Sequence, residues 1–265
     1  MLRFNQYYDM IFTRRKGETI MGKLNGKVAI VTGATAGIGT GIVECFAEEG
    51  AKVVFCGRRA EKGSALEKEF AEKGYDTYFV QADMSKNEDI QNLMDKTIEK
   101  YGKLDILVNN AGIMAMTPFL NVDLEKDWDS VINLNLRSYF VASQMAAKLM
   151  GAGSSIINIA SIGGLSGAPY LASYGASKAA TISLTRTCGI ELAPMGIRTN
   201  AILPGTIFSE MMPRDGEFTA STIAKIPMGR GGEVKEIGTV AAFLASEEAS
   251  YVCGTSIVVD GGMTS

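Results

Sequence analysis

Residues 27–39 read Lys27-Val28-Ala29-Ile30-Val31-Thr32-Gly33-Ala34-Thr35-Ala36-Gly37-Ile38-Gly39. The stretch begins with a short apolar run, which predicts a buried strand. Glycines follow, and then apolar residues at helical spacing through Phe46 and Ala47. A strand, a glycine turn and a helix in this order direct helix N-terminal amides at a pyrophosphate. The spacing Gly-x-x-x-Gly-x-Gly differs from the standard Gly-x-Gly-x-x-Gly, so a plain strand–helix turn stays open as the alternative.

The same alternation of strand and helix continues downstream. Apolar runs at 51–57, 76–83 and 104–108 predict three more strands, and helical patterns lie between them. Strands that alternate with helices predict a doubly wound parallel sheet, an α/β fold that binds ligands at the carboxyl ends of its strands. Four residues lie at or just after those ends: Gly33, Arg58, Asp83 and Asn110.

The end of the second predicted strand bears on the choice of cofactor. An acidic residue there binds the ribose 2′-hydroxyl of NAD, whereas an arginine accommodates the 2′-phosphate of NADP. The sequence has Gly57-Arg58-Arg59 and no carboxylate, which favours NADP(H) and leaves NAD(H) possible. A solvated basic turn is the alternative. After the third strand, Asp83 is positioned either to accept a hydrogen bond from the adenine amino group or to cap the next helix.

The composition excludes several classes of function. The chain has 265 residues, a net charge of -3 and no histidine, so a Ser-His-Asp triad and histidine-liganded zinc are excluded. The charge gives no reason to expect nucleic acid as a partner. No apolar run reaches the ~20 residues of a membrane-spanning helix, and the start lacks the features of a secretory signal. We therefore expect a cytoplasmic protein with no membrane partner and no metal site. The four cysteines are expected to be free thiols buried as small hydrophobes.

Tyr174 and Lys178 are the leading candidates for proton chemistry. Residues four apart on a helix lie on one face. A free tyrosine has a pKa of ~10 and is a poor catalyst at neutral pH, and a neighbouring ammonium lowers that pKa. Without histidine, this pair is the best placed to move a proton on or off a hydroxyl or carbonyl oxygen.

Taken together, the motifs resemble those of the short-chain dehydrogenase/reductase family. They are Thr32-Gly33-x-x-x-Gly37-Ile38-Gly39, Asn109-Asn110-Ala111-Gly112, Ser161, Tyr174-x-x-x-Lys178 and Pro204-Gly205, in the family's order and spacing. The resemblance covers about residues 23–265. It implies one Rossmann-type domain with about seven parallel strands, and a reaction in which hydride passes between the nicotinamide and a secondary alcohol or ketone.

The resemblance also implies a catalytic group of Asn135, Ser161, Tyr174 and Lys178, with Asn133 as the fallback for Asn135. The asparagine would hold a water in a proton relay, Ser161 would bind the substrate oxygen, and Lys178 would also bind the nicotinamide ribose. Ser161 precedes Tyr174 by 13 residues, as the family pattern requires. The implied cofactor contacts are Gly33, Thr35, Gly37, Ile38, Gly39, Arg58, Arg59, Asp83, Met84, Asn110, Ala111, Gly112, Tyr174, Lys178, Pro204, Gly205, Ile207 and Ser209.

Two further segments carry predictions. Residues 1–22 have aromatic residues at helical spacing and are predicted to form a short helix that docks on its own domain or on a neighbouring subunit. A lid over the active site and a membrane-surface helix are the alternatives. Residues 206–228 lack periodicity and are rich in methionine, which suits an adaptable, hydrophobic substrate loop; a helix pair packing its core face is the alternative. The closing strand around 254–262 is typical of members that form homotetramers, with a homodimer as the alternative.

The substrate is predicted to be a hydrophobic small molecule, with a hydroxysteroid preferred. The main alternative is a 3-oxoacyl thioester on a carrier protein, whose docking needs basic residues beside the cleft. Met195 stands where such reductases often carry an arginine, and the segment Ile113–Thr117 is apolar where they usually carry charge. A third reading is a sensor that binds NADP(H) without turnover, although such proteins usually lose the tyrosine or the lysine.

Overall fold

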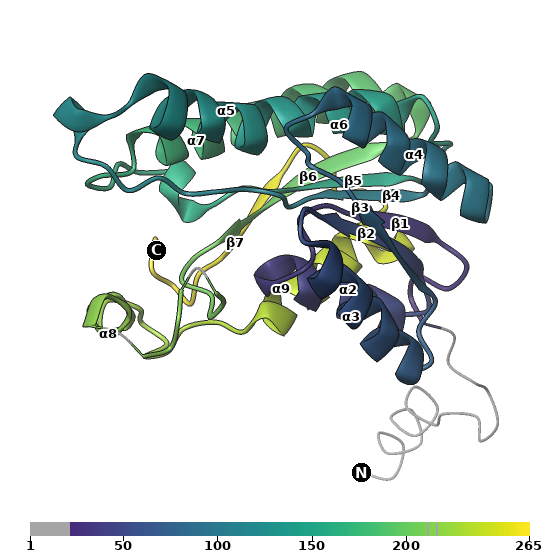
Figure 1. Ribbon diagram of the computed structural model, residues 1–265, viewed down its shortest axis with the longest axis horizontal. Coiled ribbons are helices and arrows are strands. Elements are labelled where there is room, and N and C mark those ends of the chain that lie inside the picture. Colours follow the sequence, from purple (N-terminus) through teal and green to yellow (C-terminus); the bar gives the residue numbers. More distant parts are fainter. Residues whose placement is uncertain (1–21, 211, 216) are drawn as a thin grey trace, which may run out of the picture.

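The computed structural model describes residues 22–210, 212–215 and 217–265. Within these residues seven parallel strands form one sheet in the order β3-β2-β1-β4-β5-β6-β7 (Figure 1). The strands are β1 (Val28–Val31), β2 (Lys52–Gly57), β3 (Thr77–Gln81), β4 (Ile106–Asn109), β5 (Ser155–Ile159), β6 (Arg198–Pro204) and β7 (Ser256–Val259). The predicted single-domain, Rossmann-type doubly wound sheet is confirmed. Of the predicted N-terminal extension, residues 1–21 lie outside the described residues.

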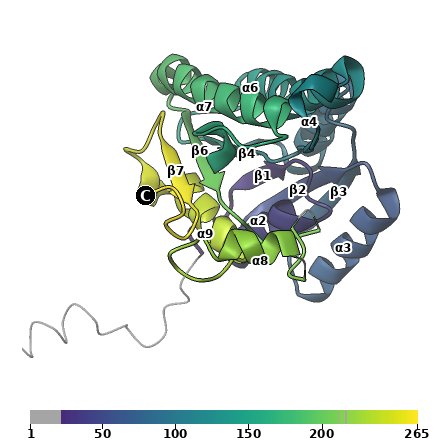
Figure 2. The same ribbon diagram turned by 90° about the vertical axis from the view of Figure 1, so that its left-hand side faces the viewer.

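Helices cover both faces of the sheet (Figure 1). One face carries α2 (Gly37–Glu48), α3 (Ala60–Glu72) and α9 (Val234–Ala245). The other carries α4 (Asn87–Tyr101), α5 (Ser130–Ile132), α6 (Ser138–Ala147) and α7 (Ala172–Leu192). The shorter helices are α8 (Glu217–Ile223), η1 (Phe119–Asn121), η2 (Leu124–Asp129), η3 (Asn133–Arg137), η4 (Ile162–Gly164), η5 (Ala193–Met195) and η6 (Glu247–Ala249). Figures 1 and 2 place α8 and the C terminus on the same side of the molecule.

The sheet is buried on both faces because helices cover each side of it, and successive side chains of each strand point alternately to the two sides (Figure 1). In β2, Val53 and Phe55 pack in the cluster under α2 and α9, whereas Val54 and Cys56 pack in the cluster under α4 and α6. This explains why the strands read as continuous apolar runs in the sequence.

The strand order reverses beside β1. The chain passes from β1 outward to β2 and β3, and then returns to β4, which pairs with β1 on its other side, with Ala29 opposite Ile106. In open α/β sheets ligands bind at such a switch point, outside the carboxyl ends of the strands. The fold therefore places the residues after β1 and β4 at the mouth of a crevice.

The cysteine prediction is correct in one respect and wrong in another. All four cysteines are free, but only Cys45 and Cys56 are buried, while Cys188 is half-buried and Cys253 is exposed. Cys253 follows η6 in the loop before β7, away from the core. In the described part of the chain no helix is long and apolar enough to cross a membrane, and no cluster of potential metal ligands occurs.

Candidate active site

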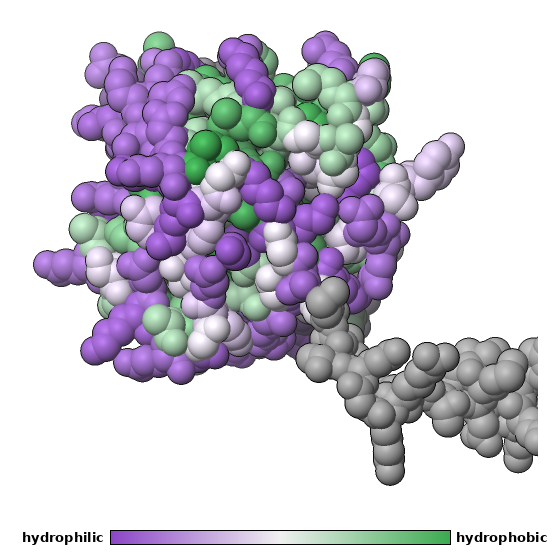
Figure 3. All heavy atoms as spheres, turned by 90° about the vertical axis from the view of Figure 1, so that its right-hand side faces the viewer, coloured by the Kyte–Doolittle hydropathy of each residue, from purple (hydrophilic) through white to green (hydrophobic). Residues whose placement is uncertain are grey.

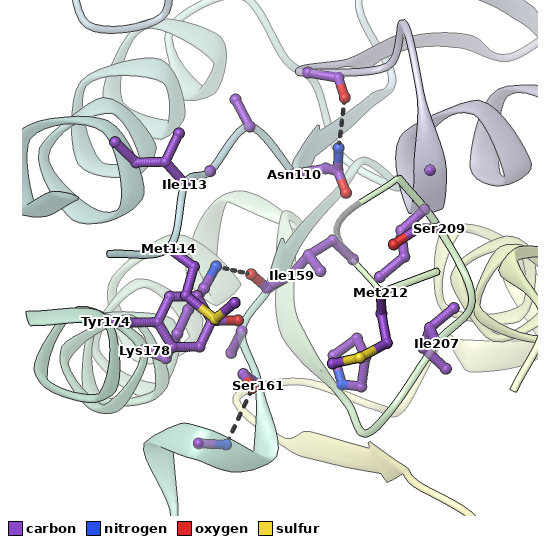
Figure 4. A pocket seen from close by; sticks show the side chains of 18 of the residues that line it. Asn110, Ile113, Met114, Ile159, Ser161, Tyr174, Lys178, Ile207, Ser209 and Met212 are labelled. Atoms are coloured by element: carbon purple, nitrogen blue, oxygen red, sulfur yellow. Dashed lines mark hydrogen bonds between the residues drawn. The ribbon is translucent and has the colours of Figure 1, made fainter. Parts of the chain in front are cut away.

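A cavity of about 760 Å³ lies along the carboxyl ends of the strands. Its wall includes every predicted cofactor residue except Gly39, and Ser161 as well. Figure 4 shows Ser161, Tyr174, Lys178 and Met114 gathered on one side of it, with Ile207, Ser209 and Met212 opposite. The structure thus brings together residues more than 150 positions apart, from Gly33 to Ser209.

The glycine turn after β1 needs glycine for two physical reasons. Gly33 has a φ of 63° and Gly37 a φ of 61°, in the left-handed region that favours glycine. A Cβ at Gly33 would also lie 2.6 Å from the Cα of Ala111. The turn opens onto the N terminus of α2, and Gly33 and Gly37 present backbone without side chains to the cavity. This cradle fits a pyrophosphate, which such amides and the helix dipole attract.

Thr32 and Asn110 tie this turn to the end of β4. The Thr32 hydroxyl accepts hydrogen bonds from the backbone N–H groups of Asn110, at 3.0 Å, and Ala111, at 3.1 Å. The Asn110 amide donates to the carbonyls of Thr32, at 2.8 Å, and Gly33, at 3.0 Å. Both Asn110 amide hydrogens are therefore used in holding the turn. Thr32 was quoted in the motif, but its role in joining the two strand ends was not predicted.

Gly39 lies behind the turn rather than in the cavity wall. A Cβ there would come within 2.6 Å of the Asn110 amide nitrogen and 2.7 Å of the Cα of Ala34. Glycine at this position lets α2 approach β4 closely, so its part in cofactor binding is indirect.

At the end of β2 the cavity wall consists of a glycine, Gly57, followed by two basic residues. A Cβ at Gly57 would lie 2.6 Å from Thr35 Cγ2, so Thr35 packs directly on the strand end. Arg58 and Arg59 follow and both line the cavity. Arg59 pairs with Glu210, with its Nη1 at 3.1 Å from a carboxylate oxygen. A basic strand end of this kind fits a 2′-phosphate.

Asp83 is not the cap of the following helix. The N-cap of α4 is Lys86, and Asp83 instead accepts hydrogen bonds from the backbone N–H and hydroxyl of Ser85. Burial acts to raise the pKa of Asp83, but these hydrogen bonds and the charge of Arg58 outweigh it and lower the pKa. Asp83 therefore stays ionised at the cavity wall, where its predicted contact with adenine stays a prediction. Met84, beside it, is buried.

Ser161, Tyr174 and Lys178 come together where β5 ends against α7. The Ser161 hydroxyl accepts a hydrogen bond from the Gly163 N–H at 3.0 Å, which fixes it at the strand end. Lys178 Nζ donates to the Ile159 carbonyl at 2.8 Å and lies 5.7 Å from the Tyr174 ring centroid. The expected common face of tyrosine and lysine is thus present.

The electrostatics of the pair differ from the expectation. Burial raises the pKa of Tyr174 above its ordinary value, and a hydrogen bond with Ser161 offsets only part of that rise. Burial also lowers the pKa of Lys178 to about 7. The prediction that Lys178 lowers the tyrosine pKa is therefore not met, because its Nζ binds a backbone carbonyl in a desolvated site. Tyr174 is protonated at neutral pH, which suits proton donation to a ketone.

A second tyrosine, which the sequence analysis missed, lies against Lys178. Tyr139 is fully buried, and its ring centroid is 5.3 Å from Lys178 Nζ. Its hydroxyl donates to the Ile159 carbonyl at 3.2 Å, so this carbonyl accepts from both side chains. No local sequence signal marks Tyr139, because it approaches Lys178 from α6.

Asn135 and Asn133 occupy different environments. Asn135 is fully buried in the π-helical η3, where its Oδ1 accepts from the Ile113 N–H and its Nδ2 donates to the Ile113 carbonyl. Its amide also donates to the Ser177 hydroxyl at 3.2 Å. Asn133 lies near Ser85 instead. Asn135 is thus the one adjacent to α7, but it stands behind the cavity wall, and its role in a proton relay stays a prediction.

The segment after β6 forms the opposite wall. Gly205 permits close packing, since a Cβ there would lie 2.7 Å from the Cβ of Asp260. Ile207 pairs with Gly232 in an isolated bridge, and Ser209 lies across from the glycine turn, 3.3 Å from where a Gly37 Cβ would be. Pro204, Gly205, Ile207 and Ser209 all line the cavity, and their contacts with the cofactor stay a prediction.

The remaining wall, where a substrate would lie, is largely apolar. It includes Ile113, Met114, Leu171 and Met212, and also Met263 near the C terminus, which the sequence analysis did not identify. Part of the predicted loop 206–228 lies at the cavity, namely Thr206, Ile207, Ser209, Glu210 and Met212. Met211 lies outside the described residues.

Comparison with known proteins agrees with this geometry. The family model described as enoyl-(acyl carrier protein) reductase matches residues 33–264. The 3-oxoacyl-(acyl-carrier-protein) reductase FabG of Thermotoga maritima is 40% identical over 249 residues, which cover 91% of this chain and 99% of that protein.

Two solved structures have the same fold. A short-chain dehydrogenase from Burkholderia cenocepacia, in complex with NADP, matches with a TM-score of 0.89 and 32% identity over 92% of this chain and 100% of that one. A blue fluorescent protein from a metagenomic library, in complex with NADPH, matches with a TM-score of 0.87 and 38% identity over the same shares of both chains. The chain belongs to the short-chain dehydrogenase/reductase family. It is an NAD(P)-dependent oxidoreductase that acts on a CH–OH or keto group.

Proposed function

We propose that this protein uses NADPH to reduce the ketone of a 3-oxoacyl thioester to the 3-hydroxyacyl product. The observation that carries the proposal is the pair of hydroxyl groups, Ser161 and Tyr174, on one wall of a cavity whose other end is the glycine turn. The relative named a 3-oxoacyl-(acyl-carrier-protein) reductase, at 40% identity, supports this substrate over the hydroxysteroid preferred from the sequence.

The residues of this chain supply the polar half of the reaction. The carbonyl oxygen accepts hydrogen bonds from Ser161 and Tyr174, which places the carbon for attack. When bound, NADPH supplies the hydride. Tyr174, protonated because burial raises its pKa, gives its proton to the developing alkoxide. Lys178 is held in place by its hydrogen bond to the Ile159 carbonyl, and its side chain would bind the nicotinamide ribose.

The cofactor is NADP(H) rather than NAD(H). Arg58 and Arg59 line the cavity directly after β2, where a 2′-phosphate needs positive charge. Two relatives of known structure, the Burkholderia dehydrogenase and the metagenomic protein, are complexes with NADP and NADPH. A carboxylate directly at the strand end, which favours NAD, is absent from the sequence at this position.

A ketone of an apolar small molecule, such as a steroid, is the second candidate. It is favoured by the apolar walls at Met114, Leu171, Met212 and Met263. In addition, Met195, where a carrier-protein reductase often has an arginine, is 51% exposed and offers no charge to an acidic partner. The apolar cavity wall and the uncharged Met195 also fit a 3-oxoacyl group carried by coenzyme A, which needs no basic docking surface for an acidic carrier protein.

A substrate panel separates these candidates. The kcat/KM for NADPH oxidation is measured with a 3-oxoacyl group on acyl carrier protein and on coenzyme A, with a 2-enoyl thioester, and with a steroid ketone. We expect a 3-oxoacyl thioester to be the best substrate. A steroid ketone or an enoyl thioester that exceeds it at least tenfold would reject the proposal. Tyr174→Phe is the control: it should bind NADPH yet lose nearly all turnover, whereas a sensor would show no turnover with either protein.

A homotetramer or homodimer stays part of the proposal. Exposed apolar side chains on the α5–α7 layer and its connections include Phe119, Leu120, Phe140 and Ile190, and the loop before β7 exposes Tyr251. Figure 3 shows hydrophobic side chains gathered in the upper half of one face, over the layer of α4, α6 and α7. Light scattering coupled to size-exclusion chromatography tests this assembly. The expected cytoplasmic location stays a prediction.

A further inference from the structure

One carboxylate reaches into the basic end of the cavity from a distant part of the chain. Glu210, next to Ser209 on the segment after β6, accepts from Arg59 Nη1 at 3.1 Å and from Lys62 Nζ at 2.6 Å. Arg59 and Lys62 are the N-cap and third residue of α3, so the ion pairs join the end of β2 to the opposite cavity wall. Glu210 and Arg59 are 151 residues apart in the sequence.

The backbone presents Glu210 in this position. Residues 209 and 212 exchange hydrogen bonds, with Ser209 N–H to the Met212 carbonyl and Met212 N–H to the Ser209 carbonyl, both at 3.1 Å. Glu210 lies inside this tight turn. Lys62 and Arg59 hold the pKa of its carboxyl below the ordinary value, so the carboxylate is ionised at neutral pH.

A 2′-phosphate and Glu210 need the same donors. The phosphate carries about two negative charges and pairs well with arginine and lysine. Arg59, Lys62 and Glu210 are 48%, 48% and 57% exposed, so each ion pair is weak enough for a phosphate to displace. NADH has a neutral hydroxyl at this position and would leave the ion pairs intact. By this chemistry a carboxylate at position 210 would oppose NADPH binding and leave NADH binding unaffected.

We propose that Glu210 is an internal competitor for the 2′-phosphate subsite and a specificity-determining residue that limits the preference for NADPH over NADH. This inference rests on the proposed use of NADP(H). Arg58, which also lines the cavity, supplies the part of the preference that does not depend on Glu210. The carboxylate comes from a different element than the acidic residue that follows the second strand in NAD-binding proteins.

The test uses Glu210→Gln, which keeps the size of the side chain and removes its charge. Glu61→Gln is the matched control, because Glu61 carries the same charge on the first turn of α3 but makes none of the ion pairs found among the described residues. Wild type and both variants are titrated at low salt with NADPH, NADH, adenosine 2′,5′-bisphosphate and ADP, with binding followed by calorimetry. The last two probes isolate the adenosine end from the nicotinamide.

We expect Glu210→Gln to bind NADPH and the bisphosphate roughly three- to thirtyfold more tightly, from the loss of two exposed ion pairs that compete with the phosphate. Its affinities for NADH and ADP should change less than twofold, and Glu61→Gln should match wild type. In an Arg59→Ala, Lys62→Ala background, the gain from Glu210→Gln should fall below twofold, because the competition acts through these cations.

Two kinds of negative result are distinguishable. If wild type prefers NADPH but Glu210→Gln gains nothing, or gains equally for NADH, the inference is wrong and the proposed function stands. If wild type binds NADH more tightly than NADPH, and ADP as tightly as the bisphosphate, the proposed use of NADP(H) fails and the inference fails with it.

Discussion

Replacing Lys178 with methionine should stabilise the fold while it removes turnover. Lys178 is 4% exposed, and burial lowers its pKa from 10.5 to about 7. An unfolded lysine stays protonated at pH 7, so this shift corresponds to about 4 kcal/mol of lost stability at that pH. Methionine has a similar length and no charge to desolvate, and it removes this cost.

Two contacts stabilise the buried ammonium of Lys178 and offset part of this cost, so the net gain in stability of the variant is smaller than about 4 kcal/mol. The charge-assisted hydrogen bond to the Ile159 carbonyl contributes about 1.5 kcal/mol, and the rings of Tyr139 and Tyr174 add about 1 kcal/mol. The Ile159 carbonyl keeps the Tyr139 hydroxyl as a donor in the variant, so no buried acceptor is left unpaired. We therefore expect Lys178→Met to be about 1–2 kcal/mol more stable than wild type at pH 7.

The sign of the pH dependence gives a second, independent check. Above pH 7 the folded protein releases the Lys178 proton, whereas the unfolded chain holds it until about pH 10.5. The unfolded state binds more protons in this window, so wild-type stability rises with pH and the advantage of Lys178→Met shrinks. Urea unfolding followed by circular dichroism at pH 7 and pH 9.5 measures both effects, with the exposed Lys148→Met as control. A variant less stable than wild type at pH 7, or an advantage that grows with pH, would refute the reasoning.

Further predictions concern the positioning of Lys178 and the glycine turn. Tyr139→Leu removes the ring beside the ammonium, so kcat should fall roughly tenfold and its basic limb should move to lower pH, whereas Tyr139→Phe keeps the ring and should stay within about threefold. Pre-steady-state and steady-state pH profiles check this, and equal profiles for both variants would contradict it. Gly33→Ala places a Cβ at 2.6 Å from Ala111 Cα with φ at 63°, so it should destabilise the protein by about 1–3 kcal/mol and weaken cofactor binding at least tenfold. Urea unfolding and NADPH titration measure both, and unchanged affinity would exclude the proposed cradle.

Local sequence patterns were enough to predict the frame of the site. The apolar run before Gly33 and the helical spacing after Gly39 are properties of neighbouring residues, and a buried parallel strand must show the first. Tyr174 and Lys178 share one helix, so their juxtaposition follows from spacing alone. Because parallel strands end at one edge, Arg58 and Asn110 could be placed at the cavity before the structure was known.

Contacts between distant segments could not be read from such patterns. Glu210 meets Arg59 only because the segment after β6 folds back over the end of β2, and Met263 reaches the cavity from the last residues of the chain. The environment of Lys178 also depends on Tyr139 in another helix, so the sequence suggested a lowered tyrosine pKa where burial in fact dominates. The preference for a hydroxysteroid rested on single positions such as Met195. Its exposed, uncharged side chain offers no basic contact to a carrier protein, but it does not identify a substrate.

We propose above that this site transfers hydride from NADPH to the keto carbon of a 3-oxoacyl thioester, with Tyr174 as the proton donor. The decisive measurement uses NADPH in which both C4 hydrogens of the nicotinamide are deuterium, and follows the deuterium into the product by mass spectrometry, for wild type and for Tyr174→Phe. The account predicts one deuterium on the carbon that carries the new hydroxyl with wild type and almost no labelled product with the variant. An unlabelled product, or equal labelling by Tyr174→Phe, would contradict it.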